Sequence, residues 1–353
     1  MSQNWMRHFE LQIVDNDGKG ISLSDFKVVV RIECADTRWP RVANVTVYNL
    51  SPDTQNRIMG KEFAKIRIIA GYDGIAPAVP ASEVGKVREV KAGQEGQTNG
   101  LNYGLIFQGD IRFTVTGRDN VTDSWIRIQA CGENEAFIYA SVKTTLAAGW
   151  TAADLHAVSM KSFNAYGVTQ GATGEMPPNV FPRGRVIYKS TRDVMDDVAG
   201  MCRATWQMMD GKLQMVSEDK YLYEAIRLNA DTGLIGQPQQ TMGGGVNVRC
   251  LLNPNIKIHG LIEIDQASVY RAALDNQEIS RSQARANEVD NNGLRQVQGT
   301  VQNPASIATD GVYIVKAIDY TLDTRGQPWY MDMMCFARGA ADLQANASLN
   351  RTF

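Results

Sequence analysis

Alternation of apolar and polar residues constrains the fold of this chain more than any other feature. In residues 26–34 every second side chain is apolar, whereas Lys27 and Glu33 fall on the opposite face. This two-residue period is typical of a β-strand with one buried face. The same period recurs in further runs of the first part of the chain: Phe9–Val14, Val42–Tyr48, Phe63–Ala70, Leu105–Thr116 and Trp125–Cys131. Strands of this kind and number favour an antiparallel barrel or sandwich.

Two segments within the first 142 residues depart from this period. Ser51-Pro52-Asp53-Thr54 predicts the start of a short helix, because proline is tolerated in the first helical turn. Residues 73–102 are dominated by Gly, Ala, Pro, Glu and Gln and hold few large apolar side chains. We expect them to form an extended loop or hairpin that projects from the β domain.

The middle of the chain changes to the 3.6-residue period of helices. Thr151 and Asp154 have the spacing of a capping box, and Ser190 precedes a second helical pattern. After that pattern, Asp210-Gly211 separates two alternating runs and predicts a hairpin turn. The sequence therefore predicts a small α+β domain over residues 143–222.

From about residue 223 the two-residue period returns. Val246–Leu252 ends at Asn253-Pro254, which cannot continue a central strand, and Ile256–Ile264 is the next alternating run. Val312–Leu322 and Trp329–Phe336 predict a closing antiparallel pair. We expect a second β domain over residues 223–340, a polar insertion at 274–310 and a C-terminal tail at 341–353.

Composition and charge exclude several functional classes. The 353 residues carry 36 Lys and Arg against 38 Asp and Glu, a formal net charge of −2. A dedicated nucleic-acid binder normally has a basic excess, whereas a near-neutral protein can let nucleic acid slide past without retaining it. No stretch approaches the roughly 18 apolar residues of a membrane span, and the N-terminus has no secretory pattern. The five cysteines lie far apart, which predicts buried free thiols and a reducing compartment.

Residues capable of catalysis or ligand binding form no recognisable motif. The three histidines, His8, His156 and His259, lie in separate segments, and none belongs to a nucleophile or metal motif. Asp15-Asn16-Asp17-Gly18 begins like a calcium loop, but its glycine comes too early and Phe26 stands where the loop requires Glu. No glycine–lysine pair has the spacing of a phosphate loop. We therefore predict no cofactor and no metal site.

Two carboxylate pairs have the composition of a glycosidase site: Glu133 with Glu135, and Asp196 with Asp197. The first pair follows a strand, where charged turn residues are ordinary. The second pair lies on the outer face of an amphipathic helix, where acidic side chains are solvated. Three tryptophans fall in strand runs and are interpreted as core or interface anchors rather than sugar platforms: Trp125, Trp206 and Trp329. The chain is therefore predicted not to be an enzyme.

Four motifs follow one another along the chain. Val47-Tyr48-Asn49-Leu50-Ser51 leads from a strand into the short helix, and Gly109-Asp110-Ile111 precedes the strand Trp125–Gly132. Thr232-Gly233-Leu234-Ile235-Gly236-Gln237-Pro238 continues through Val246 to Asn253-Pro254, and Asp323–Tyr330 is the last motif. The ordered set resembles the baseplate hub proteins of tailed bacteriophages, which are related to the hub part of type VI secretion spike proteins.

This resemblance implies a mainly β fold, in which two tube-like antiparallel β-barrel domains flank a small α+β domain. The first barrel would span residues 1–142 with the extended loop 73–102, and the second would span 223–340 with the insertion 274–310. The resemblance further implies a structural virion protein. It would be a homotrimeric baseplate hub that joins the hexameric tail tube to the trimeric central spike and forms part of the channel for genome ejection.

The resemblance also implies where this protein acts and with what. It would be located in the tail baseplate of the virion, after assembly in the host cytoplasm. Its partners would be the tail tube protein, the central spike protein and other baseplate proteins, with DNA only in transit and no membrane span.

The two insertions, 73–102 and 274–310, carry no motif of that family, so their partners are open. Four arginines lie in or beside the second insertion: Arg271, Arg281, Arg285 and Arg295. We predict that they contact partner surfaces, with a solvated polar arm as the alternative.

Three other functions stay open at this point. Another tail-tip or tube-initiator protein would share the barrel fold but needs no middle domain. A tail-associated cell-wall or capsule hydrolase would lose activity when Glu133 or Glu135 is replaced. A carbohydrate-binding module would lose glycan binding in the variant Trp329→Ala.

Overall fold

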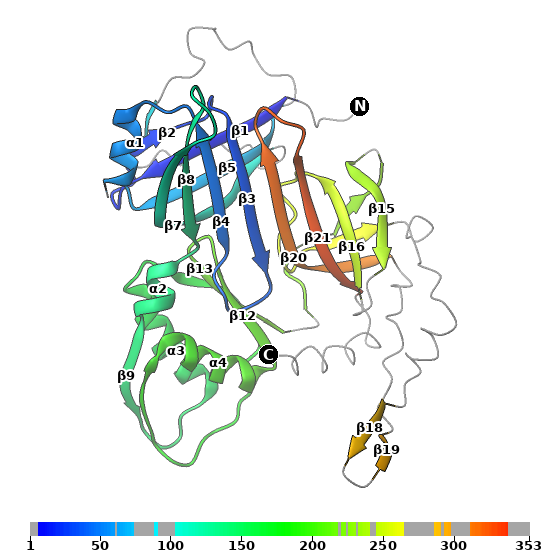
Figure 1. Ribbon diagram of the computed structural model, residues 1–353. Helices are drawn as coiled ribbons and strands as arrows, with labels where there is room; N and C mark the ends of the chain where they lie inside the picture. Colours follow the sequence, from blue (N-terminus) through cyan, green and yellow to red (C-terminus); the bar gives the residue numbers. More distant parts are fainter. Residues whose placement is uncertain are drawn as a thin grey trace.

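The structure is a computed structural model that describes residues 6–60, 62–73, 88–90, 103–217, 220–223, 225–230, 232–240, 245–264, 286–290, 293–297 and 311–337. Strands dominate this part of the chain, which confirms the predicted mainly β fold (Figure 1). Helix α1 (Pro52–Met59) lies between two of these strands and begins after the N-cap Ser51, as predicted.

One large sheet contains fourteen of the described strands. Their order is β15-β16-β21-β20-β3-β4-β8-β7-β5-β1-β2-β6, with β17 beside β20 and β14 beside β17. The strands are β1 (Arg7–Val14), β2 (Gly20–Ser22), β3 (Val28–Ala35), β4 (Val42–Tyr48), β5 (Lys65–Tyr72), β6 (Arg88–Val90), β7 (Tyr103–Arg118), β8 (Ser124–Cys131), β14 (Ala225–Leu228), β15 (Leu234–Gln240), β16 (Gly245–Leu251), β17 (Leu261–Ile264), β20 (Val312–Asp323) and β21 (Trp329–Ala337).

The alternation that predicted the strands decides which face of the sheet is buried. On β3, Val28, Val30 and Ile32 are fully buried, whereas Arg31 and Glu33 on the opposite face are exposed. β4 repeats this pattern beside it, so the apolar faces of both strands enter the same core. The other face of these strands stays open to solvent, as expected for an antiparallel sheet with one buried face.

The first and last β segments of the chain meet at the pair β3–β20. Ile32 on β3 lies opposite Tyr320 on β20 in an antiparallel ladder. Figure 1 shows β3, β4, β20 and β21 side by side. Residues from both segments, such as Phe9 and Trp329 with ring centroids 6.2 Å apart, contribute to a single hydrophobic core.

A compact α+β module follows β8 and has its own core, centred on fully buried residues such as Leu155, Phe163 and Val194. Within it, β12 pairs with β13, β10 runs parallel to β13, and β9 and β11 form a separate ribbon. Its elements are α2 (Asn134–Tyr139), β9 (Ser141–Leu146), α3 (Ala152–Asn164), β10 (Thr169–Thr173), β11 (Arg185–Ser190), α4 (Thr191–Cys202), β12 (Ala204–Met209) and β13 (Lys212–Ser217).

Local signals in the module are confirmed. Thr151 and Asp154 form the capping box that starts α3. Asp210 and Gly211 connect β12 to β13 with φ angles of 52° and 75°, the left-handed conformation that this tight turn requires. Four of the five cysteines are buried and all are free, in agreement with the sequence prediction.

The run Ile256–Ile264 does not form a strand along its whole length, contrary to the sequence prediction. Only β17, at its end, is a strand, and a turn precedes it in which Gly260 N donates to the carbonyl of Lys257. His259 adopts a φ of 62°, which interrupts the strand, and its buried side chain contacts the carboxylate of Asp36 at 3.0 Å. A tertiary contact thus overrides the local period.

Little of the two insertions belongs to the described residues. In the first, β6 pairs with β2 at the edge of the large sheet. In the second, β18 (Ala286–Asp290) and β19 (Gly293–Val297) form a hairpin. The other residues of the predicted segments 73–102 and 274–310 fall outside the described residues, apart from Asp73 at the end of β5, and so does the whole C-terminal tail 341–353.

Candidate functional surfaces and the joint between sheet and module

The solvent-exposed side of the eight strands from β15 to β7, here called the open face, carries ordered rows of polar side chains. One row follows the register from β16 to β3: Arg249, Asp332, Asp319 and Glu33 lie opposite one another on successive strands. Three carboxylates therefore occupy adjacent positions. Like charges directly opposite each other across a ladder are destabilising, so this row is unfavourable for the isolated sheet.

The electrostatics of this acidic row are uneven. Arg249 forms a bidentate ion pair with Asp332, at 2.6 and 3.0 Å. Partial burial, together with the charges of Glu33 and Asp332, raises the pKa of Asp319. Among the described residues no ion pair engages Glu33 or Asp319. Glu33 and Asp319 therefore leave negative charge without an ion pair in this row, with Arg31 two positions from Glu33 on the same face of β3.

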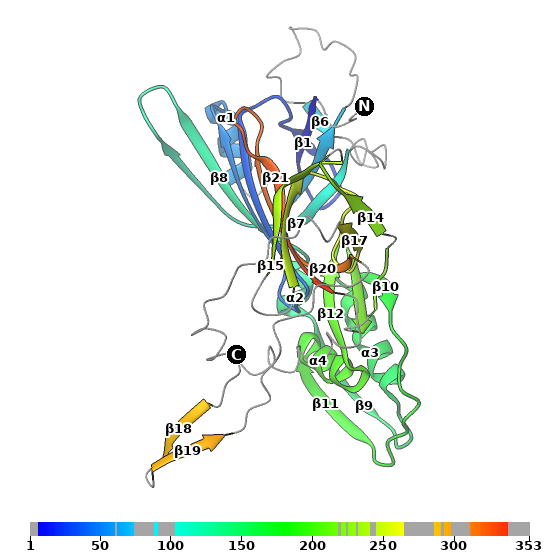
Figure 2. The same ribbon diagram turned by 90° about the vertical axis from the view of Figure 1, so that its right-hand side faces the viewer.

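The hairpin of β7 and β8 extends the sheet at one end and projects from it (Figure 2). Phe113 and Val115 on β7 are about half exposed, and Val121 at the tip is 93% exposed. The indole of Trp125 donates to Asp119 at 2.8 Å, so polar contacts hold the tip in shape. Exposed apolar side chains on a rigid hairpin are typical of a surface that contacts another protein.

The eight-strand run ends at β15, whose outer edge no other described strand covers, and at β7, whose second edge is covered over only part of its length. β15 pairs only with β16. β7 pairs with β5 as far as Asp110, and beyond Ile111 its second edge makes no described backbone pairing. An uncovered edge presents a row of N–H and C=O groups that can pair with another chain.

A polar joint fastens the α+β module to one end of the sheet. The turn between β12 and β13 enters this end, and Met209 belongs to the core of the sheet rather than to that of the module. The guanidinium of Arg41, 5% exposed, lies 2.9 Å from Asp210. Glu133 accepts a hydrogen bond from Gly211 N at 2.6 Å. Burial is the main cause of the raised pKa of Glu133, which Arg41 and this hydrogen bond only partly oppose.

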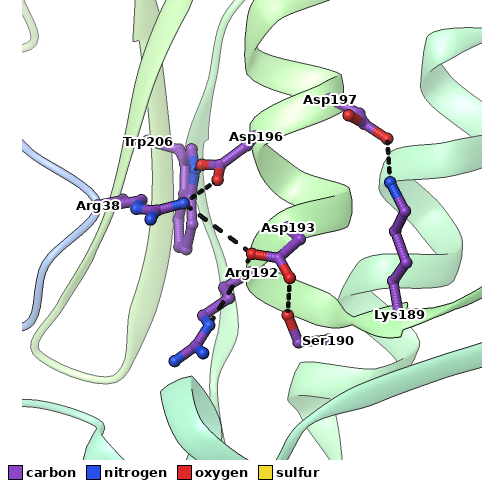
Figure 3. A network of polar contacts seen from close by, with 8 residues as sticks. All are labelled: Arg38, Lys189, Ser190, Arg192, Asp193, Asp196, Asp197 and Trp206. Carbon is purple, nitrogen blue, oxygen red and sulfur yellow. Dashed lines mark hydrogen bonds and ion pairs between the residues drawn. The ribbon is translucent and has the colours of Figure 1, made fainter. Parts of the chain in front are cut away.

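A second group of contacts joins the loop after β3 to helix α4 (Figure 3). Arg38 forms an ion pair with Asp196, whose other oxygen accepts the indole N–H of Trp206 at 2.8 Å. Arg38 also lies 4.0 Å from Asp193. Figure 3 shows Arg38 reaching from the sheet toward carboxylates on one face of α4, so these charges orient the module.

The third part of the joint is a buried cluster around Asp36, whose side chain is 6% exposed. Its carboxylate lies 3.0 Å from His259 Nε2 and 2.8 Å from Lys316 Nζ, and it accepts a hydrogen bond from the Thr205 hydroxyl. These partners come from the loop before β17, from β20 and from β12. The cluster therefore ties both β segments to the module.

Three of the four carboxylates considered for catalysis, Glu133, Asp196 and Asp197, have structural partners, whereas Glu135 makes a described hydrogen bond only through its backbone. Glu133 belongs to the joint, and the backbone N–H of Glu135 donates to Asp110. Asp196 and Asp197, side by side in sequence, bind different cations, Arg38 and Arg185 respectively. The structure does not bring either pair into one cleft with a free carboxylate.

The other residues singled out in the sequence are dispersed. His156 is buried on α3, and burial lowers its pKa. Trp206 and Trp329 are 3% and 2% exposed, which agrees with core anchors, whereas Trp125 lies on the open face. No helix among the described residues is long and apolar enough to cross a membrane. Within the same residues no group of three His, Cys, Asp or Glu side chains is placed to hold a metal ion.

The structure does not test the prediction that four arginines contact partner surfaces. Three of them fall outside the described residues: Arg271, Arg281 and Arg285. The backbone of Arg295 lies on β19, opposite Glu288 of β18. The sequence analysis did not predict the joint. Its signal in the sequence is that Arg41 and Glu133 stand beside apolar strand ends. Ordinary turn residues show the same pattern.

Comparison with known proteins identifies the fold. No protein-family model and no curated protein matches the sequence. Among solved structures, the chain is similar to the 43 kDa tail protein of prophage MuSo2 from Shewanella oneidensis, with a TM-score of 0.53 and 7% identity over 95% of this chain and 98% of that one. It is also similar to the tail protein from Neisseria meningitidis MC58, with a TM-score of 0.50 and 7% identity over 97% and 99%. The predicted resemblance to phage tail proteins is therefore confirmed at the level of the fold.

Proposed function

We propose that this protein is a structural component of a phage tail, a homotrimeric baseplate hub that joins the hexameric tail tube to the trimeric central spike. The observation that carries the proposal is the fold, which matches phage tail proteins over nearly the whole of both chains. Its place would be the tail baseplate of the virion, assembled in the host cytoplasm. A non-enzymatic role agrees with the structural partners of Glu133, Asp196 and Asp197.

The strand order supports closure of a ring by three copies. From β15 to β7 every neighbouring pair is antiparallel, so the first and eighth strands run in opposite directions. The uncovered edge of β15 can therefore pair antiparallel with the outer part of β7 in the next copy. Head-to-tail contacts of this kind close into a ring when the rotation between copies is 120°.

The open face would then line the channel. DNA is retained by surfaces rich in Lys and Arg, because binding releases the counterions of the phosphates. Glu33 and Asp319, which form no described ion pair while Arg249 pairs with Asp332, do the opposite and repel phosphates at short range. A negative belt is what a passage for genome ejection requires, since the DNA must not adhere to the wall.

In this proposal residues 1–142 and 223–340 act as the two tube-like barrel domains, and residues 143–222 act as the middle domain. Arg271, Arg281, Arg285 and Arg295 would contact other baseplate proteins. The buried contacts of the joint, Asp36 with His259 and Lys316 and Arg41 with Asp210, support a firm connection between the ring and the middle domain.

Oligomeric state tests the proposal directly. Native mass spectrometry of the full chain should give trimers, and negative-stain electron microscopy should give threefold rings. Ile235→Lys places a charge at the edge of β15, where Ile235 is 37% exposed, and should convert trimers into monomers. Ile138→Lys, at a residue 43% exposed on α2, is the matched control and should leave the trimer intact. A monomeric wild-type chain, or trimers that survive Ile235→Lys, would contradict ring closure through this edge.

A further inference from the structure

His8, near the start of β1, lies in a row with two other strands. In the ladders His8 is opposite Gly71 of β5, and Gly71 is opposite Tyr103 of β7. Because Gly71 has no side chain, the rings of His8 and Tyr103 meet above it, with centroids 3.8 Å apart and planes inclined by 15°. Stacked rings over a strand glycine protect the backbone that the glycine leaves uncovered.

Both nitrogens of the His8 imidazole face carboxylates. Nδ1 lies 2.5 Å from Asp73, just after β5, and Nε2 lies 3.2 Å from Glu10 on β1. The side chains of His8 and Glu10 are 14% and 18% exposed, so water screens these contacts only in part. Gln12 donates a further hydrogen bond to Glu10 at 3.3 Å. The described groups that face His8 are thus Glu10 from its own strand, Asp73 from the end of β5 and Tyr103 from β7.

The protonation state of His8 decides how many of these contacts are hydrogen bonds. An imidazolium donates from both nitrogens, whereas a neutral imidazole donates from only one. Burial lowers the pKa of His8, but the hydrogen bonds with Glu10 and Asp73 and the charges of these carboxylates outweigh it and raise the pKa above the ordinary 6.5. The cationic form is therefore the one that fits this site.

We propose that His8 is a proton-operated clamp, which in its protonated form ties β1, the end of β5 and the start of β7 together and loosens when the proton leaves. Deprotonation removes the imidazole donor from one of the two carboxylates, and the carboxylates then repel each other across a neutral ring. The strand ends held by the clamp, Asp73 and Tyr103, are far apart in the sequence. This device is independent of the proposed hub role, because it needs only contacts within one chain.

The direction of the pH effect follows from linkage. Because the folded pKa of His8 is raised above its unfolded value, the stabilisation is fully present below about pH 6.5 and disappears as the pH rises through the folded pKa. The change should stay local, because Phe9 and Tyr72, the neighbours of these groups in β1 and β5, remain anchored in the hydrophobic core. The clamp should therefore release the edge of β1 without unfolding the sheet.

Nuclear magnetic resonance tests the clamp, because the full chain has only three histidines. With labelled histidine, the ring signals of His8 should titrate above pH 6.5, while His156, whose pKa is lowered by burial, serves as an internal reference. Hydrogen exchange, corrected for its intrinsic pH dependence, should accelerate about fivefold at Arg7–Glu10 and Gly71–Asp73 across that titration, the factor expected for one net hydrogen bond. Peptides from α3 should show no step.

Three variants separate the clamp from a merely structural contact. Asp73→Asn and Glu10→Gln should each lower the pKa of His8 and shift the exchange step to lower pH. His8→Gln should abolish the step while circular dichroism still reports a folded chain. A His8 pKa at or below 6.5, or an unchanged exchange step in His8→Gln, would overturn the proposal. If His8→Gln does not fold, an exchange step that stays at the same pH in Glu10→Gln would overturn it.

Discussion

Asp36 and His259 form a buried contact of 3.0 Å between a strand end of the first β segment and a loop of the last one. The same carboxylate binds Lys316 on β20 and accepts a hydrogen bond from Thr205 in the module. One side chain therefore connects three regions of the chain. Because Asp36 is buried, its contribution to stability depends on whether its carboxylate is ionised. Unfolding measured at different pH values can therefore test it.

Stability should depend on the ionisation of Asp36 at low pH. Burial raises its pKa, but the hydrogen bond from His259 and the charge of Lys316 outweigh burial and lower the pKa to about 2. The contribution of Asp36 is thus fully present above its unfolded value of 3.8 and is lost as the pH falls toward 2. Urea unfolding at pH 5.5 should show Asp36→Asn to be less stable by about 3 kcal/mol, because Lys316 loses its partner.

The same difference measured at pH 2.5 should be clearly smaller, since Asp36 of the wild-type chain is then partly protonated. Asp17→Asn, at an exposed turn, is the control and should change stability by less than about 0.5 kcal/mol at either pH. An Asp36→Asn effect that is equal at both pH values would contradict the assigned role.

Removing the buried cation of the joint should be costly. Arg41→Met leaves Asp210 and Glu133 without their cation at a site where Arg41 is 5% exposed, and should destabilise the chain by about 3–5 kcal/mol. Arg57→Met, where the pair with Glu62 is about half exposed, should cost less than about 1 kcal/mol. Both values come from urea unfolding monitored by tryptophan fluorescence, and similar costs at the two sites would show that the joint contributes little.

Neutralising the centre of the acidic row should stabilise the protein. In the wild-type chain, repulsion from Glu33 and Asp332 is one cause of the raised pKa of Asp319. Asp319→Asn removes this repulsion and should increase the free energy of unfolding by about 0.2–1 kcal/mol at neutral pH and low salt. In 1 M salt the gain should vanish, because the screening length falls to about 3 Å. Asp332→Asn should give no gain, since it breaks the bidentate pair with Arg249.

Two glycines should respond in opposite directions to alanine. A Cβ at Gly109 on β7 would lie 2.5 Å from the backbone oxygen of Cys131, so Gly109→Ala should cost about 1–3 kcal/mol through forced backbone movement. At Gly200 on α4 a Cβ meets no described atom within 4 Å, so Gly200→Ala should gain about 0.5–1 kcal/mol. Thermal unfolding of both variants and of the wild-type chain measures these changes in stability. If both variants are stabilised, or both destabilised, the prediction is wrong.

Much of the local structure could be predicted from sequence because it depends on neighbouring residues. The alternation in β3 and β4 marks their buried faces, since side chains of a strand point to opposite sides in turn. The capping box at Thr151 and the turn at Asp210 are set by hydrogen bonds and backbone angles within a few residues. The ordered motifs also led to a family whose fold the structure shares.

Sequence alone determined the main strands of the large sheet, their buried faces, and the starts of α1 and α3, because these features rest on short-range periodicity and caps. Only the tertiary structure decided that β3 pairs with β20, that Arg41 meets Asp210, and that His8 stacks on Tyr103. Such partners are far apart along the chain, and whether a charged side chain is exposed or buried depends on what packs against it. The interrupted run before β17 has the same cause, because burial of His259 against Asp36 outweighed the local strand preference.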